Sequence, residues 1–191
     1  MGFTQAELAT FRNATVPDLV GPGLKLLFVG INPGLWTAAT STHFAHPGNR
    51  FYPALYDAGV IEAPIDRGRG MDDDERAQLV RRGIGITNLV ARATARASEL
   101  TAAELRSGAE RLITFVHQHR PKVIAVAGVT AYRDAFGRRD TVAGRQPDTL
   151  AGVELWVVPN PSGLNAHETQ ASLAAAYCEP ARAAGIDLVS R

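Results

Sequence analysis

The chain has 191 residues, of which 46% are hydrophobic and 20% are charged, so it is long enough to bury the core of one soluble domain. Its apolar runs end after roughly ten residues, too short for a membrane span, and its amino terminus lacks the apolar segment of a secretory signal peptide. With one cysteine, Cys178, the chain can form neither an internal disulfide nor a thiolate metal cluster, and we expect a cytoplasmic protein without a membrane anchor.

The net charge of +1 sets few limits on the partners of the chain. A field this weak neither requires nor excludes nucleic acid. The arginines occur in local pairs such as Arg92 and Arg96, which we interpret as solvated surface charge. The five histidines are scattered and form no HExxH pair, so no metal site is predicted.

Four uniformly apolar segments are predicted to be strands of one sheet. Uniform rather than alternating hydrophobicity is typical of parallel strands that are buried on both faces. The predicted strands are Leu24–Ile31, Ile84–Val90, Val123–Ala127 and Val153–Val158.

Helical patterns surround these segments, and two of them begin with a capping box. The predicted helices are Thr4–Phe11, Arg50–Asp57, Asp72–Arg82, Thr101–His119, Val129–Phe136 and His167–Ala184. Pro180 is expected to kink or end the last one. The alternation predicts an α/β fold, a three-layer αβα sandwich around a four-stranded, mainly parallel central sheet. Because no linker or repeat is visible, residues 1–191 are expected to form a single domain.

Two of the predicted strands run directly into an Asn-Pro turn. The first reads LLFVGIN and ends at Asn32, and the second reads LWVV and is followed by the turn at Asn160. Open α/β sheets place their binding sites at the carboxyl ends of the strands. We therefore expect the two turns to form the two lips of one cleft.

Asn32 is a candidate for chemistry because Pro33 and Gly34 fix the backbone around it. A carboxamide can orient a water molecule but is a poor base for its proton. This combination suits a dissociative reaction, in which the leaving group departs before water attacks. The alternative is a strand-end turn in which Asn32 only caps backbone groups.

Other positions have both a binding and a structural interpretation. Phe44, in a loop rich in Gly, Pro and His, could stack on a planar ligand or belong to the core. Asn88, within GITNLV, could bind the imide edge of a pyrimidine or be satisfied inside the fold. Leu164 could enter a base stack as an apolar wedge or act as a hydrophobic staple at a helix start. Asn49 and Arg50 could be a helix cap followed by a surface charge.

Signatures of several other α/β proteins are absent from the sequence. The first strand is not followed by GxGxxG, and neither GxxxxGK[ST] nor GxSxG occurs. A dinucleotide site, an NTP site and an α/β-hydrolase are therefore disfavoured.

The ordered set GINPG, FAHPGNRFY, GITNLV and NPSGLN resembles the mismatch-specific uracil/thymine-DNA glycosylase family, within the uracil-DNA glycosylase superfamily. The resemblance extends from about Gly23 to the final predicted helix. It implies a monofunctional enzyme that flips uracil, or more slowly a mispaired thymine, out of duplex DNA and hydrolyses the N-glycosidic bond. It implies no metal and no cofactor.

The resemblance also implies roles for particular residues. Asn32 would position the attacking water, and Ile31, Phe44 and Asn88 would bind the flipped base. The implied DNA contacts are Leu164 in the vacated stack, Gly163 and Asn165 at the orphaned guanine, and Thr37, Asn160 and Ser162 at flanking sugars and phosphates.

We therefore expect a monomeric DNA repair glycosylase of bacterial type. Its partner would be double-stranded DNA with a G·U or G·T mismatch, and ethenocytosine is a further candidate substrate. Two alternatives remain open. One is a sister uracil-DNA glycosylase that also acts on single-stranded DNA, and the other is a non-catalytic α/β module that binds nucleic acid in the same cleft.

Overall fold

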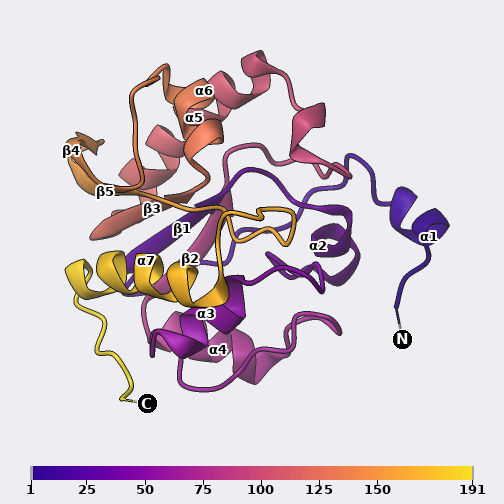
Figure 1. Ribbon diagram of the computed structural model, residues 1–191, viewed down its shortest axis with the longest axis horizontal. Coiled ribbons are helices and arrows are strands. Elements are labelled where there is room, and N and C mark those ends of the chain that lie inside the picture. The colour runs from indigo at the N-terminus through magenta and orange to yellow at the C-terminus, as the bar shows by residue number, and fades with distance from the viewer. Residues whose placement is uncertain (1, 191) are drawn as a thin grey trace.

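The computed structural model describes residues 2–190 as an α/β fold built around one mixed sheet (Figure 1). The sheet has five strands in the order β2-β1-β3-β5-β4. Four of them run parallel to their neighbours, and β4 is antiparallel to β5. The strands are β1 Leu26–Gly30, β2 Ile84–Asn88, β3 Val123–Ala127, β4 Gly144–Leu150 and β5 Val153–Val158. The predicted fold class is confirmed, but the predicted number of four strands is wrong.

The missed strand β4 is a polar edge strand. Its sequence is GRQPDTL, most of its residues are partly or fully exposed, and its pairing with β5 is irregular between Arg145 and Thr149. Pro147 is tolerated there because an edge strand can lack a ladder hydrogen bond. A two-residue turn with positive φ at Ala151 and Gly152 joins β4 to β5, as in tight hairpins. A search for apolar runs cannot find such a strand.

Helices cover both faces of the sheet (Figure 1). Alternate residues of β1 point to opposite sides, so that Leu26 and Phe28 belong to one core cluster and Leu27 and Val29 to the other. The first cluster is covered by α3 Phe51–Asp57, α4 Asp73–Arg81 and α7 Gln170–Ala183. The second is covered by α5 Ala102–His119 and α6 Val129–Phe136. This is the predicted three-layer arrangement.

The helix boundaries agree with the predictions to within about three residues, and the capping boxes at Thr4 and Thr101 are present. The first helix, α1 Gln5–Ala9, is shorter than predicted, and α7 starts at Gln170 because Thr169 is its cap. Pro180 lies inside α7 and does not end it. The short helix α2 Leu35–Thr40 and the 3₁₀ turn η1 Ala97–Glu99 were not predicted. Among residues 2–190, no helix is both long and apolar enough to cross a membrane.

Helix α5 packs closely on the backbone that follows β2. A Cβ atom placed on Gly108 would lie 2.4 Å from Leu89 O and 2.9 Å from the Leu89 carbonyl carbon. Both contacts are with main-chain atoms, which cannot move aside as a flexible side chain can. Gly108 is therefore required by packing rather than by its backbone conformation.

We expect Gly108→Ala to lower the free energy of unfolding by about 1–3 kcal/mol, the usual range for overpacking. In an open helix the same change would be stabilising by up to about 1 kcal/mol. Urea denaturation measures the difference. The control is Ser107→Ala at the exposed neighbouring position of α5, which we expect to leave stability unchanged or slightly raised. A Gly108→Ala protein as stable as the wild type would contradict the packing interpretation.

Candidate active site

The parallel strands bring their carboxyl ends to one edge of the sheet. Asn32 follows β1, Gly128 follows β3 and Asn160 follows β5, while Asn88 is the last residue of β2 and pairs with Gly30 of β1. The chain leaves β1 towards β2 on one side and returns to β3 on the other. This is the kind of switch point at which open α/β sheets bind ligands.

The carboxamide of Asn32 is fixed by its nitrogen. Asn32 Nδ2 donates to Thr94 Oγ1 at 2.8 Å, to Arg92 O at 3.0 Å and to Pro33 O at 3.1 Å. Backbone carbonyls can only accept, so the amide cannot rotate by 180° without placing an oxygen against them. Within residues 2–190, no donor occupies Asn32 Oδ1. The oxygen is therefore held in a single orientation and remains open to a water molecule.

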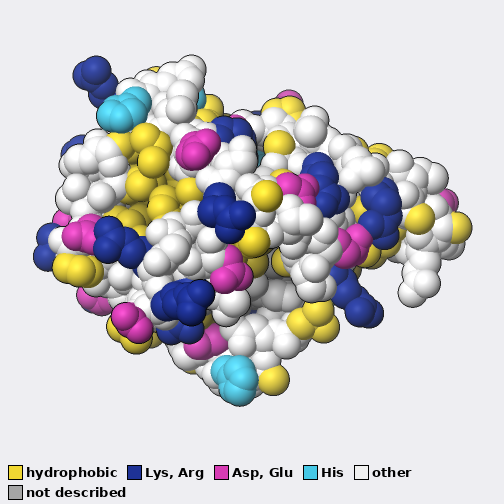
Figure 2. Space-filling model, turned by 90° about the horizontal axis from the view of Figure 1, so that it is seen from above, with side chains coloured by type: hydrophobic (Ala, Val, Ile, Leu, Met, Phe, Trp, Pro, Cys, Tyr) yellow, Lys and Arg dark blue, Asp and Glu magenta, His cyan; other side chains and the backbone are white. Residues whose placement is uncertain are grey.

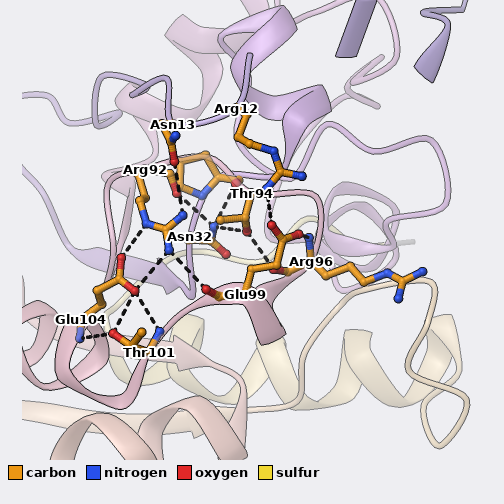
Figure 3. A network of polar contacts seen from close by, with 10 residues as sticks. Arg12, Asn13, Asn32, Arg92, Thr94, Arg96, Glu99, Thr101 and Glu104 are labelled. Atoms are coloured by element: carbon orange, nitrogen blue, oxygen red, sulfur yellow. Dashed lines mark hydrogen bonds and ion pairs between the residues drawn. The ribbon is translucent and has the colours of Figure 1, made fainter. Parts of the chain in front are cut away.

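The segment that holds Asn32 is itself anchored by charge (Figure 3). The Arg92 guanidinium bonds both carboxylate oxygens of Glu104, at 2.5 Å and 3.2 Å, and also donates to Glu99 O at 3.2 Å. The Arg92 bond, together with two bonds from Thr101, lowers the pKa of Glu104 from 4.5 to about 2. Glu99 in turn pairs with Arg12. Two of the three acceptors of Asn32, Arg92 O and Thr94 Oγ1, thus belong to a segment that is tied to the start of α5.

Phe44 and Asn88 meet beside Gly30. A Cβ atom on Gly30 would lie 2.4 Å from Asn88 Oδ1 and 3.3 Å from the ring of Phe44, so only glycine permits this approach. Phe44 has a φ of +55° and stacks on Phe51 with 4.1 Å between ring centroids. It is half-buried. Phe44 therefore packs against the core with part of its ring and leaves part exposed.

His43 orients the carboxamide of Asn88. His43 Nε2 lies 3.1 Å from Pro17 O, an acceptor, and must carry the ring proton. The unprotonated Nδ1 then accepts from Asn88 Nδ2 at 3.2 Å. Burial lowers the pKa of His43, which favours this neutral form. Asn88 Oδ1 therefore points away from His43, and one amide hydrogen of Asn88 remains available. The hydroxyl of the neighbouring Thr87 donates a hydrogen bond to Asp18 Oδ1 at 2.6 Å.

The second turn presents Leu164 to solvent. Leu164 is 87% exposed, and α7 begins only at Gln170, so Leu164 is not a helix staple. Asn160 Oδ1 accepts from Ser162 N at 3.0 Å, and Asn160 O accepts from Asn165 Nδ2 at 3.0 Å. The polar side chains of the turn thus fold the loop around its apolar tip.

A groove of about 600 Å³ runs between the two turns. Its walls include Ile31, Arg96, Gly128, Asn160, Ser162, Leu164 and Asn165. The groove thus lies between Ile31 of the first turn and several residues of the second turn. Asn32, Phe44, Asn88 and Gly163 are not among its lining residues. Thr37 does not line the groove. It is 4% exposed, and its hydroxyl accepts from Ala45 N at 3.4 Å, an arrangement that favours support of the Phe44 loop over direct phosphate contact.

Several residues of the site have no clear signal in the sequence. Arg92 was interpreted as surface charge, although it anchors the segment that holds Asn32. Thr94 and His43 lie next to recognisable motifs, but only their contacts reveal what they orient. The face seen in Figure 2 shows basic and acidic side chains interspersed, without a continuous field of one sign. Among residues 2–190, no group of three or more His, Cys, Asp or Glu could hold a metal.

The buried His43 makes the stability of the protein depend on pH. Below about pH 6.5 the unfolded chain protonates this side chain, whereas the folded protein, with its lowered pKa, does not. The free energy of unfolding therefore falls as the pH falls from 6.5 towards the lowered pKa, by up to about 1.4 kcal/mol per pH unit. Asp18 opposes the lowering and Arg76 adds to it.

We expect His43→Gln to reduce the loss of unfolding free energy between pH 7 and pH 5, as measured by urea denaturation at each pH. The control is His117→Gln, because His117 is exposed on α5 and its replacement should leave the slope as in the wild type. His46, whose pKa is also lowered by burial, accounts for a remaining slope. Equal slopes in the wild type and His43→Gln would contradict a buried, neutral His43.

Comparison with known proteins places this site in a family. The model of the uracil DNA glycosylase superfamily matches residues 17–181, which include Asn32, Phe44, Asn88 and the second turn. The solution NMR structure of a candidate uracil DNA glycosylase from Methanosarcina acetivorans is similar in fold, with a TM-score of 0.56 and 16% sequence identity. The similarity covers 86% of this chain and 97% of that one. On the match of the family model, the chain belongs to the uracil DNA glycosylase superfamily.

Proposed function

We propose that this protein is a monofunctional DNA glycosylase that removes uracil mispaired with guanine from duplex DNA, acting as a cytoplasmic monomer without a cofactor. The observation that carries the proposal is the fixed carboxamide of Asn32. Its nitrogen donates to three acceptors, and its oxygen accepts from no donor within residues 2–190, which leaves it free to hold a water. Membership of the superfamily supports the reaction class, and the finer assignments rest on the site residues.

Asn32 suits a reaction in which bond breaking runs ahead of water attack. The N-glycosidic bond breaks first, and its electron pair leaves with the base. A water held at Asn32 Oδ1 then adds to C1′ of the sugar and releases its proton to solvent. Because an amide cannot accept that proton, Asn32 contributes by holding the water close to the reacting carbon.

The departing base needs donors that stabilise its growing negative charge. The free amide hydrogen of Asn88 is one, and Phe44 offers a ring face for stacking. Uracil presents an N–H between two carbonyl oxygens, so Asn88 can accept from that N–H and donate to one oxygen. Cytosine presents the opposite pattern. It would require the Asn88 amide to turn round and to lose its bond to His43 Nδ1, which favours uracil.

Entry of the base requires opening of the duplex. The exposed Leu164 is placed to occupy the space that a flipped nucleotide leaves. Flipping costs a few kcal/mol, and least for a mismatched base. Uracil and thymine opposite guanine are therefore favoured before any chemistry. Gly163 and Asn165 flank Leu164 in the sequence and are the candidates for contact with the orphaned guanine.

The deciding experiment uses labelled duplexes with G·U, A·U, G·T and G·C pairs, together with single-stranded uracil DNA, each incubated and then cleaved with alkali. We expect cleavage fastest at G·U and none at G·C. Equal rates on single strands would favour a sister uracil-DNA glycosylase. DNA binding without cleavage of any substrate would favour a non-catalytic module.

Asn32→Ala should reduce single-turnover release of uracil from the G·U duplex by at least about 100-fold, the effect expected when a reactant is no longer positioned. DNA affinity should change little, because Asn32 is assigned to the water and not to the DNA backbone. Gln118→Ala, which removes an exposed amide on α5, is the matched control. Full activity of Asn32→Ala would remove the main support for the proposal.

Thr94 tests whether the orientation of Asn32 matters. Thr94 Oγ1 accepts from Asn32 Nδ2 at 2.8 Å and donates to Arg96 O at 2.8 Å. Thr94→Val keeps the shape but removes both bonds, and should slow uracil release about tenfold, equivalent to about 1.4 kcal/mol. Thr94→Ser keeps the hydroxyl and should retain most of the rate. If the valine and serine variants are equally active, this hydrogen bond has no part in positioning the water.

A further inference from the structure

Arg50 forms several hydrogen bonds with the loop that carries Leu164. Its guanidinium donates to Ser162 O at 2.8 Å, to Asn165 O at 2.8 Å and to Glu168 O, and its backbone N–H donates to Pro161 O at 3.0 Å. All four acceptors belong to residues 159–169, here called the wedge loop. Arg50 itself lies at the start of α3, more than one hundred residues earlier in the sequence and on a different element.

The same two segments also touch backbone to backbone. A Cβ atom on Gly163 would lie 2.6 Å from Gly48 O and 3.2 Å from the Gly48 carbonyl carbon. Gly163 immediately precedes Leu164, and Gly48 belongs to residues 44–50, here called the stacking loop. In Figure 1 the orange-yellow segment before α7 lies beside the segment that leads into α3, in agreement with these contacts.

The stacking loop carries both Phe44 and Arg50. Phe44 packs on Phe51, the first residue of α3, and Asn49 Oδ1 accepts from Phe51 N at 2.9 Å. The ring proposed to receive the base and the guanidinium that holds the wedge loop are therefore fixed to the same helix start. A displacement of one loop must disturb the other.

An exposed leucine can open a base stack only if its loop resists the opposing force. The wedge loop lies outside the sheet and the helices, so its stiffness depends on other contacts. A guanidinium is planar and presents several donors in a fixed geometry, so it can donate hydrogen bonds to three carbonyl oxygens at once. A loop ordered in advance also avoids the entropy cost of ordering on binding. Arg50 Nε is buried without a partner among the described residues, so the contacts of Arg50 with the wedge loop come from its other donors.

We propose that Arg50 is a positioning residue that locks the wedge loop to the stacking loop, so that strand opening by Leu164 and capture of the base at Phe44 act as one rigid unit. The inference rests on the proposed function and adds a mechanical link that is independent of the chemistry at Asn32. It assigns a role to the Arg50 of the PGNRF segment other than a solvated charge.

The test compares Arg50→Lys with the wild type on two substrates under single-turnover conditions. Lysine keeps the charge but cannot reach three carbonyls with one ammonium group. We expect uracil release from a G·U duplex to fall about 10- to 100-fold, the range of coupled contacts. Opposite an abasic site the uracil has no base-pairing partner, so flipping needs no base pair to be broken. There the rate of uracil release by Arg50→Lys should fall less than about threefold. Leu164→Ala should show the same contrast.

A double variant separates this role from general damage to the fold. If Arg50 acts through Leu164, the Arg50→Lys/Leu164→Ala protein should be no slower on G·U than the slower single variant. The proposal would be overturned if the rate reductions of the two single variants multiplied in the double variant. It would also be overturned if Arg50→Lys slowed uracil release equally on both substrates. If circular dichroism shows that Arg50→Lys is unfolded, the Gly163→Ala variant tests the proposal instead. Its added Cβ would push the two loops apart while leaving Arg50 in place. Gly163→Ala must then show the same contrast between substrates.

A readout without chemistry distinguishes failure of this inference from failure of the proposed function. 2-Aminopurine placed beside the uracil becomes brighter when its stack is opened. We expect the wild type and Asn32→Ala to raise this fluorescence on binding and Arg50→Lys to raise it much less. If the wild-type protein opens the stack but releases no uracil, the proposed glycosylase function is refuted, whereas the proposed role of Arg50 in holding the wedge loop is not. Equal fluorescence with Arg50→Lys and the wild type would refute only the proposed role of Arg50 in holding the wedge loop.

Discussion

The three hydrogen bonds from Asn32 Nδ2 fix the orientation on which the rest of the site depends. An amide exposed at a strand end would rotate freely and hold water in many positions. Here the acceptors come from Pro33 beside it and from Arg92 and Thr94, sixty residues further along the chain. Arg92 is in turn paired with Glu104 at the start of α5. The capping box at the start of α5 is thus linked to the orientation of Asn32.

Two carboxamides in this site are oriented by different means for different purposes. Asn32 faces two carbonyls and a hydroxyl, which leave its oxygen for water. Asn88 faces a neutral histidine nitrogen, which leaves both an oxygen and a hydrogen for a base. A buried histidine that stayed charged would donate to Asn88 and reverse that amide. If Asn88 binds the base as proposed, the lowered pKa of His43 links base choice to stability.

The sequence predicts those parts of the fold that arise from local pattern. Uniform apolar runs identify β1, β2, β3 and β5, and capping boxes identify the starts of α1 and α5. The edge strand β4 lacks such a run because one of its sides is open to water. The motifs also identify the exposed Leu164 and the half-buried Phe44. They cannot identify Arg50, Thr94 or His43 as partners, because each of them acts on a residue distant in the sequence or in another loop.

The weak overall charge makes this mechanical coupling important. With a net charge of +1 and with basic and acidic side chains interspersed on the face seen in Figure 2, the protein has only a weak overall field to attract the phosphates of DNA. Under the proposed function, recognition would then come from local contacts in the groove between the two turns and from the fit of a stiff apolar wedge into a weakened base pair. A mobile wedge loop would lose part of that small binding energy to ordering. In the proposed mechanism a rigid wedge loop directs that energy to opening the pair, so the proposed selectivity for mismatches would follow from rigidity as much as from contacts with the base.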